Sequence, residues 1–206
     1  MSVFNTPIHL VKRAIDSVLK QDYQNFELIV VDDGSDILLS DELLHYCELN
    51  ELKIIYVKHK NCGQSESINR AVKISVGNYI SIIDSDDEYK PNHLSACINE
   101  MVDADLISSY TETVVNSNED YYVPDKDDNK KSIHVDDCIL FATLFGKREV
   151  FEKLAFKSMY AADAAFYESA AKDFNVKKVN LRTYIYYRNL ASSLSAQLKK
   201  AQISLQ

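Results

Sequence analysis

The stretch YISIIDSDDEYKP, residues 79–91, runs from apolar and β-favouring residues directly into three carboxylates within four positions. Its first six residues predict a buried strand, and Pro91 predicts the start of a helix. On an extended chain Asp84 and Asp86 project to one side while Ser85 points away. Carboxylates so placed repel each other unless a positive group joins them, so the stretch predicts a cation site at the end of a strand.

Strand and helix patterns alternate along the first half of the chain. Short apolar runs at residues 26–31 and 52–57 predict buried strands of a parallel sheet. This alternation predicts parallel βαβ units with helices on both faces of the sheet. The amphipathic segments that predict these helices cover residues 9–21, 38–50 and 63–75.

The second half is less regular. We expect a helix over residues 91–102, a strand over 104–115 and an exposed hairpin or flexible loop over 116–132. Shorter elements follow up to residue 188. We find no internal repeat and no linker, and therefore expect one domain over residues 1–206 whose halves share a core.

Composition excludes several classes of protein. The 206 residues are 46% hydrophobic and 26% charged, as in a globular domain, and no apolar run approaches the ~20 residues of a membrane span. The formal net charge of −8 argues against nucleic acid as the main partner. The N-terminus lacks the pattern of a secretory signal.

Neither cysteines nor histidines show the spacing of a metal site. The four cysteines predict reduced, packed thiols in a cytosolic protein. We expect the histidines to be surface or capping residues and not zinc ligands. These residues are Cys47, Cys62, Cys97 and Cys138, and His9, His45, His59, His93 and His134.

Acidic residues follow two of the expected strands. Asp32 and Asp33 end the run at 26–31, and Asp84, Asp86 and Asp87 end the run that begins at residue 79. Ligands of open parallel sheets bind beyond the carboxyl ends of the strands. Mg²⁺ and Mn²⁺ bind through one or two carboxylates together with water and substrate phosphate. The alternative is that these acids only cap helices and stabilise loops.

At this point the sequence resembles a known family, the family 2 glycosyltransferases, which transfer sugars from nucleotide diphosphates. The resemblance rests on an ordered series of motifs: VFNTP at residues 3–7, FELIVVDDGSD at 26–36, NCGQSESINRAVKISVGNYISIIDSDD at 61–87 and YRNLASSLS at 187–195. It implies the GT-A fold, an α/β architecture with a Rossmann-like, mostly parallel central sheet, helices on both faces and a smaller irregular acceptor-side region. Residues 1–103 would form the nucleotide-sugar half and residues 104–206 the acceptor half.

The resemblance also assigns the donor site. Asp33 would contact the uracil or ribose of the donor, and Asp86 would bind the metal directly with Asp84 nearer the ribose. Asp87 is a weaker candidate that could cap the next helix. The remaining residues expected around the donor and its phosphates are Phe4, Asn5, Thr6, Asp32, Gly63, Asn69, Ser85, Tyr187, Arg188 and Ser193.

Asp163 occupies the position of the family's catalytic base, in the segment YAADAAFYESAAKDF at residues 160–174. A carboxylate can take the proton of an acceptor hydroxyl when burial raises its pKa. The implied reaction is a metal-dependent transfer of one sugar, with inversion, from a donor we expect to be a UDP-sugar. The expected cofactor is Mn²⁺ or Mg²⁺, and a solvated helix residue is the alternative role for Asp163.

The sequence departs from the family pattern in three places. Only Met1, Ser2 and Val3 precede the Phe4–Asn5 pair, so we expect a shortened first strand. Ala162 stands where an acidic residue usually precedes the base. Some relatives carry an arginine where this chain has Ile68. The QxxRW motif of processive synthases is absent from these residues, which favours single transfers.

Two other functions remain open at this stage. The chain could be a non-catalytic relative that binds nucleotide or only keeps the fold, and the VVDDGS motif at residues 30–35 is also typical of a phosphoacceptor domain. If the chain is an enzyme, the resemblance implies a saccharide or lipid-linked acceptor used in surface polysaccharide synthesis. It also implies a cytoplasmic protein that can act peripherally at the inner face of the membrane. The sequence does not indicate an oligomeric state.

Overall fold

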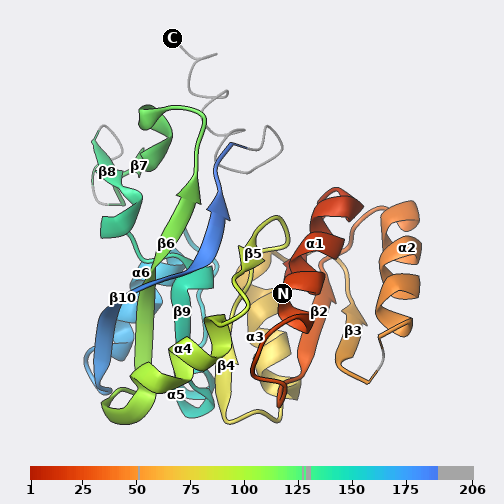
Figure 1. Ribbon diagram of the computed structural model, residues 1–206, viewed down its shortest axis with the longest axis horizontal. Coiled ribbons are helices and arrows are strands. Elements are labelled where there is room, and N and C mark those ends of the chain that lie inside the picture. Colours follow the sequence, from red (N-terminus) through yellow and green to blue (C-terminus); the bar gives the residue numbers. More distant parts are fainter. Residues whose placement is uncertain (51, 127, 129–130, 190–206) are drawn as a thin grey trace.

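The computed structural model describes residues 1–50, 52–126, 128 and 131–189 (Figure 1). Its helices are α1 (Ile8–Leu19), α2 (Ile37–Glu48), α3 (Gln64–Ile74), α4 (His93–Asn99), α5 (Arg148–Lys153) and α6 (Ala162–Ala170). Its strands are β1 (Ser2–Val3), β2 (Leu28–Asp32), β3 (Ile54–Lys58), β4 (Tyr79–Ser81), β5 (Glu88–Tyr89), β6 (Leu106–Val114), β7 (Tyr122–Pro124), β8 (Ser132–His134), β9 (Leu144–Lys147) and β10 (Val176–Tyr187). Short 3₁₀ helices cover Glu100–Asp103, Asn118–Tyr121, Val135–Asp137 and Phe141–Thr143.

A parallel sheet in the order β1-β2-β3 confirms the βαβ units expected from the first half of the sequence. Figure 1 shows α1 in front of this sheet and α3 behind it. All residues of β2 are buried, as expected for a strand covered by helices on both faces. Leu28 and Val30 lie in a core cluster with residues of α1 and α2. The expected short first strand is also present, because β1 has two residues.

The second sheet is mixed, in the order β4-β9-β6-β10-β5. β6 and β10 are parallel, whereas β9 is antiparallel to both neighbours and β5 is antiparallel to β10. The mostly parallel pairing predicted from the sequence therefore holds for the first sheet and for β6 with β10 only. Parallel neighbours need long crossover connections, and the segment before β9 has short 3₁₀ turns in place of a crossover helix. A single parallel bridge between Ser2 and Asp84 links the two sheets.

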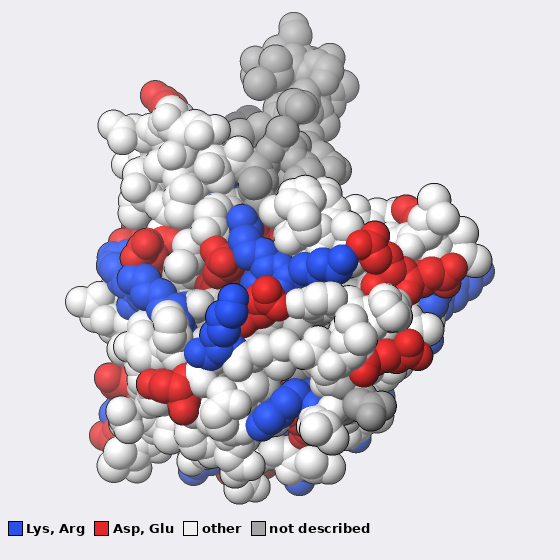
Figure 2. All heavy atoms as spheres, turned by 45° about the vertical axis from the view of Figure 1, so that its right-hand side comes forward, with Lys and Arg blue, Asp and Glu red and all other residues white. Residues whose placement is uncertain are grey.

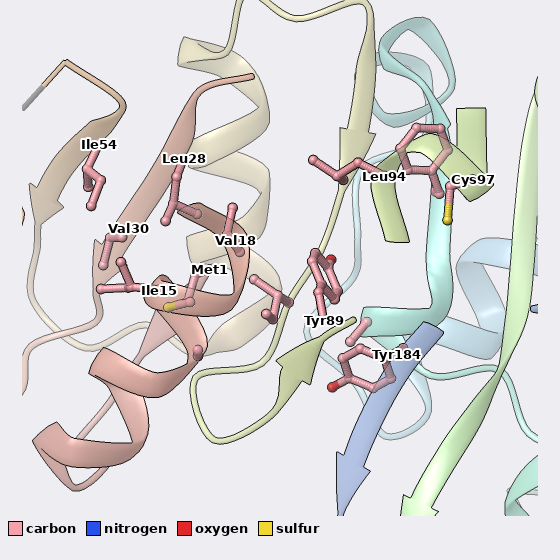
Figure 3. Packing of buried hydrophobic residues seen from close by; sticks show 14 of the residues in the cluster. Met1, Ile15, Val18, Leu28, Val30, Ile54, Tyr89, Leu94, Cys97 and Tyr184 are labelled. Atoms are coloured by element: carbon pink, nitrogen blue, oxygen red, sulfur yellow. The ribbon is translucent and has the colours of Figure 1, made fainter. Parts of the chain in front are cut away.

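Two apolar clusters join the two halves of the chain. In the first, Tyr89 and Tyr184 pack edge to face with ring centroids 5.9 Å apart, between α1 and α4 (Figure 3). The second combines Ile68 and Val72 of α3 with residues of β6, α5 and α6. The loop that follows β4 contributes Ile83 to the first cluster and Ile82 to the second, so it packs against the second half of the chain.

His93 differs from the surface or capping role expected for it. Its side chain is buried, stacks on Tyr89 at 3.8 Å between ring centroids, and lies 2.8 Å from the Thr183 hydroxyl. Burial lowers the pKa of His93 to about 3, so the ring is neutral at pH 7. The spacing of histidines could not predict this position, because it depends on how α4 packs against β10.

The polar segment at residues 116–132 confirms the predicted hairpin. β7 and β8 pair antiparallel, with Tyr122 opposite His134. The preceding expected helix is shorter than residues 91–102, because α4 ends at Asn99 and a 3₁₀ turn follows. Over the residues that the structure describes, no helix is long and apolar enough to span a bilayer.

Candidate functional site

The candidate site lies where the chain leaves β1, β2 and β3, the edge at which parallel sheets bind ligands. The loop after β4 joins this edge through the parallel bridge between Ser2 and Asp84. Hydrogen bonds tie the first loop to two of the others. The Asn5 amide donates to the Ser35 hydroxyl at 3.1 Å, and Asn5 Oδ1 accepts from the Asp36 amide at 2.9 Å. The Thr6 and Ser85 hydroxyls are 2.7 Å apart. The expected residues Asn5, Thr6 and Ser85 are thus brought together.

Phe4 and Asn5 give the first loop its shape. Asn5 has a φ of 51°, in the left-handed region that asparagine tolerates better than most residues. The Phe4 side chain is half exposed at 51%. An exposed aromatic ring held beside the acidic loops is available to contact a planar ligand.

Asp32 and Asp33 face opposite sides of the sheet, as alternation along a strand requires. The buried Asp32 accepts hydrogen bonds from the Ser35 amide, the Ser40 hydroxyl and the Tyr56 hydroxyl. Burial alone would raise the pKa of Asp32, but these hydrogen bonds outweigh it and lower the pKa below its usual value. Asp32 therefore stabilises the turn into α2 and does not face the acids of the other loops.

Asp33 is also buried, and it faces the loop after β3. It accepts hydrogen bonds from the Cys62 amide at 2.8 Å, the Gly63 amide at 2.9 Å and the Asn61 side chain at 3.2 Å. Gly34 makes this approach feasible, because a side chain there would begin 2.6 Å from the Asn61 nitrogen. The carboxylate expected to contact the nucleotide is thus engaged by the loop between β3 and α3.

Three carboxylates lie near one another on the other side of the site. Burial raises the pKa of Asp84 to about 7, and the charges of Asp86 and Asp163 add to the effect. Gln64, the first residue of α3, donates to Asp84 Oδ1 at 2.7 Å and partly opposes the rise in pKa. The fold therefore brings Asp163 within electrostatic reach of Asp84, although a long stretch of sequence separates them.

Asp86 is held from outside the cluster by Arg13 of α1. Burial raises the pKa of Asp86, while the positive charge of Arg13 lowers it. Arg13 Nη2 donates to the Asp86 carbonyl at 2.5 Å, and the guanidinium lies 3.9 Å from the centre of the Tyr187 ring. Sequence reasoning missed Arg13 and Gln64, because neither belongs to an acidic motif.

Asp163 lies in the first turn of α6. Burial raises its pKa above the usual value, and hydrogen bonds from backbone amides, including that of Ala164 at 2.9 Å, oppose the rise. Ala161 precedes the helix with a φ of 52°. A partly buried carboxyl with a raised pKa at the edge of an acidic site can act as a general base.

Asp87 has a different position from the helix cap suggested by the sequence. It is buried, where it accepts hydrogen bonds from the Tyr184 hydroxyl and from the Tyr187 amide, the latter at 2.7 Å. The residue before α4 is Asn92, not an aspartate. Asp87 thus fastens the acidic loop to β10, a contact that needs the tertiary fold.

Tyr187 and Arg188 both lie at the end of β10, but they contact different parts of the molecule. The Tyr187 hydroxyl donates to Glu88 at 2.5 Å beside the acidic loop. Arg188 is buried and donates to the carbonyls of Asp120 and Tyr122, next to the hairpin. The structure therefore brings Tyr187 to the acidic loop and engages Arg188 with backbone near β7. Ser193 lies outside the described residues.

Gly63 and Asn69 bracket the first part of α3. Gly63 precedes the helix with a φ of 92°, a conformation that glycine adopts without strain. The Asn69 side chain exchanges two hydrogen bonds with the backbone of Phe156, at 2.8 and 2.9 Å. Asn69 therefore holds the segment before α6 against α3, which helps to fix the position of Asp163.

Charges of both signs surround the site. Figure 2 shows Lys and Arg side chains interleaved with Asp and Glu side chains on one face, not one basic area. Lys12 and Glu42 pair at 2.7 Å between α1 and α2, and Arg13 lies 3.8 Å from Glu88. Of these two cations, Arg13 contacts the acidic loop and Lys12 does not.

The sequence of this chain is similar to those of known glycosyltransferases. A family model described as "Glycosyl transferase family 2" matches residues 1–168. A protein of Escherichia coli (strain K12) described as "Putative colanic acid biosynthesis glycosyl transferase WcaA" is 44% identical over 88 residues, 42% of this chain and 31% of WcaA. Glycosyltransferase GlyG of Streptococcus pneumoniae serotype 4 is 32% identical over 112 residues, 51% of this chain and 35% of GlyG.

Solved structures share the architecture. S. aureus TarS 1–349 in complex with UDP-GlcNAc matches with a TM-score of 0.71 at 18% identity, covering 93% of this chain and 59% of TarS 1–349. The mannosyltransferase PcManGT from Pyrobaculum calidifontis, in complex with GDP-Man and Mn²⁺, matches with a TM-score of 0.70 at 18% identity, over 100% of this chain and 60% of PcManGT. This chain thus spans less than two thirds of each of these proteins.

Proposed function

This chain belongs to glycosyl transferase family 2 and has the GT-A fold expected from its sequence. From that premise we propose that it transfers one sugar from a nucleotide-diphosphate sugar to an acceptor hydroxyl. The single observation that carries the proposal is the convergence of Asp84, Asp86 and Asp163. The charges of Asp86 and Asp163 both raise the pKa of Asp84. Such a cluster of acids is costly to a fold unless a ligand uses it.

Asp86 and Asp84 are the residues that would hold a divalent cation, either Mn²⁺ or Mg²⁺. Their chemistry fits, because hard divalent cations prefer carboxylate oxygens and a cation would relieve the mutual repulsion of these acids. A cation bound there would supply positive charge to the diphosphate as the sugar–phosphate bond breaks. The neighbour complex of PcManGT with GDP-Man and Mn²⁺ supports this assignment by likeness of fold.

Asp163 is the proposed base. Its carboxylate takes the proton of the acceptor hydroxyl while that oxygen forms a bond to the anomeric carbon of the sugar. The bond from that carbon to the diphosphate oxygen breaks on the opposite face, so the nucleoside diphosphate leaves and the configuration is inverted. Burial of Asp163 supports this role, because it makes the carboxylate a better proton acceptor.

For the donor we propose a UDP-sugar, bound over the loops that follow β1 and β2. Phe4, Asn5 and Thr6 would contact the nucleotide, with Asp33 near the base or ribose and Ser85 near the acids. Residues 1–103 would form the donor half and residues 104–206 the acceptor half. TarS bound to UDP-GlcNAc and PcManGT bound to GDP-Man support a nucleotide-sugar donor, and TarS supports uridine.

The proposed acceptor is a saccharide or lipid-linked saccharide of a surface polysaccharide. WcaA, described as a colanic acid biosynthesis enzyme, supports this class of acceptor. We place the reaction in the cytoplasm, at the inner face of the membrane when the acceptor is lipid-linked.

A second candidate function is nucleotide binding without transfer. It is favoured by Ala162, which gives Asp163 no acidic neighbour in sequence. The two functions differ in turnover and not in binding, so one set of measurements separates them.

The experiment is calorimetric titration of UDP with and without Mn²⁺, followed by turnover assays with a panel of nucleotide sugars. We expect Mn²⁺-dependent binding that Asp86→Ala abolishes and that the exposed control Asp41→Ala on α2 retains. Binding without turnover of any sugar donor would favour the second function. A folded protein that binds no nucleoside diphosphate would contradict both.

A further inference from the structure

A second group of metal-ligating side chains includes Asp33, which the proposed donor site also uses. Asp33 follows β2, while His59 and Cys62 belong to the loop between β3 and α3. Asp33 Oδ1 is 3.4 Å from His59 Nδ1 and 3.6 Å from Cys62 Sγ, and these two atoms are 3.3 Å apart. One oxygen, one nitrogen and one sulfur thus form a nearly equilateral triangle.

This triangle has the dimensions of one face of a tetrahedral zinc site. Zinc binds oxygen and nitrogen at about 2.0–2.2 Å and sulfur at about 2.3 Å, so tetrahedral ligands are separated by roughly 3.3–3.6 Å. We propose that Asp33, His59 and Cys62 bind a divalent transition-metal ion of the zinc class. Thiolate and imidazole ligands select zinc and its neighbours over Mg²⁺, which distinguishes this site from the carboxylates at Asp84 and Asp86.

Neighbouring groups hold two of the ligands in place. The Asp33 carboxylate accepts from the amides of Cys62 and Gly63, which fixes its orientation. His59 Nε2 lies 3.2 Å from the Ser67 hydroxyl, which itself donates to the Gly63 carbonyl at 3.1 Å. The Ser67 hydroxyl is thus free to accept a hydrogen bond from Nε2–H of His59, and the tautomer with its proton on Nε2 would leave Nδ1 with a lone pair for a metal. Outer partners of this kind are common in metal sites.

An ion pair between a protonated His59 and Asp33 is the competing interpretation. His59 Nδ1 lies 2.8 Å from the Lys60 carbonyl, a contact that needs a proton on Nδ1. A metal ion replaces that proton and also takes the thiol proton of Cys62, so binding releases protons to solvent. In the ion pair the Cys62 thiol only donates a hydrogen bond to Asp33 Oδ1, whereas with a metal its sulfur is the third ligand.

Charge and access at the site are compatible with a cation. Arg70 is near Cys62, but it pairs with Glu66 at 2.9 Å, so these two side chains offset each other. Asp33 and a Cys62 thiolate then supply two negative charges to a divalent ion. Cys62 is partly exposed, which gives the ion a route from solvent and leaves a fourth position for water.

The test uses chelator-treated, reduced protein and Co²⁺ alone as an optical probe, without nucleotide, so its outcome is independent of the proposed transferase activity. We expect one equivalent of Co²⁺ to give a thiolate-to-cobalt charge-transfer band and the visible bands of tetrahedral cobalt. One equivalent of Zn²⁺ should abolish both. Cys62→Ser should lose the charge-transfer band, whereas the control Cys138→Ser should keep it.

Two further variants keep the proposal testable if Cys62→Ser does not fold. His59→Gln retains the thiol and should bind Co²⁺ at least ten times more weakly. Ser67→Ala retains all three ligands and should weaken binding about 10-fold while keeping the charge-transfer band. A wild-type protein that shows no such band, or a band that Cys138→Ser removes and Cys62→Ser does not, would overturn the proposal.

Discussion

The Tyr184 hydroxyl, on the long strand β10, donates a hydrogen bond to the buried carboxylate of Asp87 in the acidic loop. Tyr184 is itself fully buried in the cluster that joins the two halves of the chain. Asp86 and Asp87 are neighbours in sequence, so the contact that fixes Asp87 also limits where Asp86 can lie. The geometry of the proposed metal site therefore depends on a strand from the other half of the protein.

Tyr184→Phe should destabilise the protein while keeping its apolar packing. The substitution leaves the buried Asp87 with one hydrogen-bond donor fewer, which costs about 1–3 kcal/mol of unfolding free energy. Urea denaturation followed by circular dichroism measures this difference. The exposed Tyr160→Phe should change stability little, and equal effects of the two variants would contradict the role given to Tyr184.

Asp84→Asn should stabilise the ligand-free protein at neutral pH and abolish metal-dependent nucleotide binding. The pKa of Asp84 is about 7 in the folded protein and 3.8 without its surroundings, so the folded state binds the proton more tightly. Wild-type stability from this group is therefore present below pH 4 and is lost as the pH rises towards 7. We expect the variant to gain on the order of 2 kcal/mol at pH 7.5.

The measurement is unfolding free energy from pH 5 to pH 8 for both proteins. The gain of Asp84→Asn over wild type should grow with pH across this range. A variant that is less stable at every pH would contradict the interpretation of a strained acidic cluster.

His93 should lower the stability of the protein as the pH falls, which is the opposite of the effect of Asp84. Its pKa is about 3 in the folded protein and 6.5 without its surroundings, so the unfolded chain binds the proton more tightly. The stability that His93 contributes is complete above pH 6.5 and is lost as the pH falls towards 3. Between pH 7 and pH 5 the wild type should lose about 2 kcal/mol of unfolding free energy through His93, and His93→Gln should not show this loss. The measurement is unfolding free energy from denaturant titrations at each pH. An equal change with pH in wild type and variant would exclude this role.

Asp163→Asn should separate binding from transfer. The amide keeps the size of the side chain but cannot take a proton, so we expect turnover to fall about 10²–10⁴-fold. Nucleotide binding measured by calorimetry should stay within a factor of about three, because Asp163 acts on the acceptor. Full activity in this variant would exclude Asp163 as the base.

Arg13→Met should weaken Mn²⁺-dependent nucleotide binding about 10-fold, the effect expected of a residue that supports a metal-binding loop. Arg13 donates to the Asp86 carbonyl and stacks on Tyr187, so its loss frees the loop on one side. Lys12→Met is the matched control, because the adjacent Lys12 pairs with Glu42 away from the acids. Equal binding by the two variants in the calorimeter would exclude a positioning role for Arg13.

The sequence by itself determined the local elements and the order of the motifs. The apolar run at residues 26–31 forms the buried strand β2, whereas the runs at 52–57 and from residue 79 form β3 and β4, which are only partly buried. The acids of DDGSD and DSDD follow strands because both features lie in one short segment. The βαβ units and the hairpin at β7 and β8 are confirmed for the same reason.

Only the tertiary structure decided what those acids face. Asp32 and Asp33 are adjacent in sequence, yet one stabilises the turn into α2 and the other meets His59 and Cys62 from a different loop. Asp87 accepts a hydrogen bond from Tyr184, and His93 is buried and neutral. These roles depend on contacts between residues far apart in the chain, and side-chain periodicity within one segment carries no information about them.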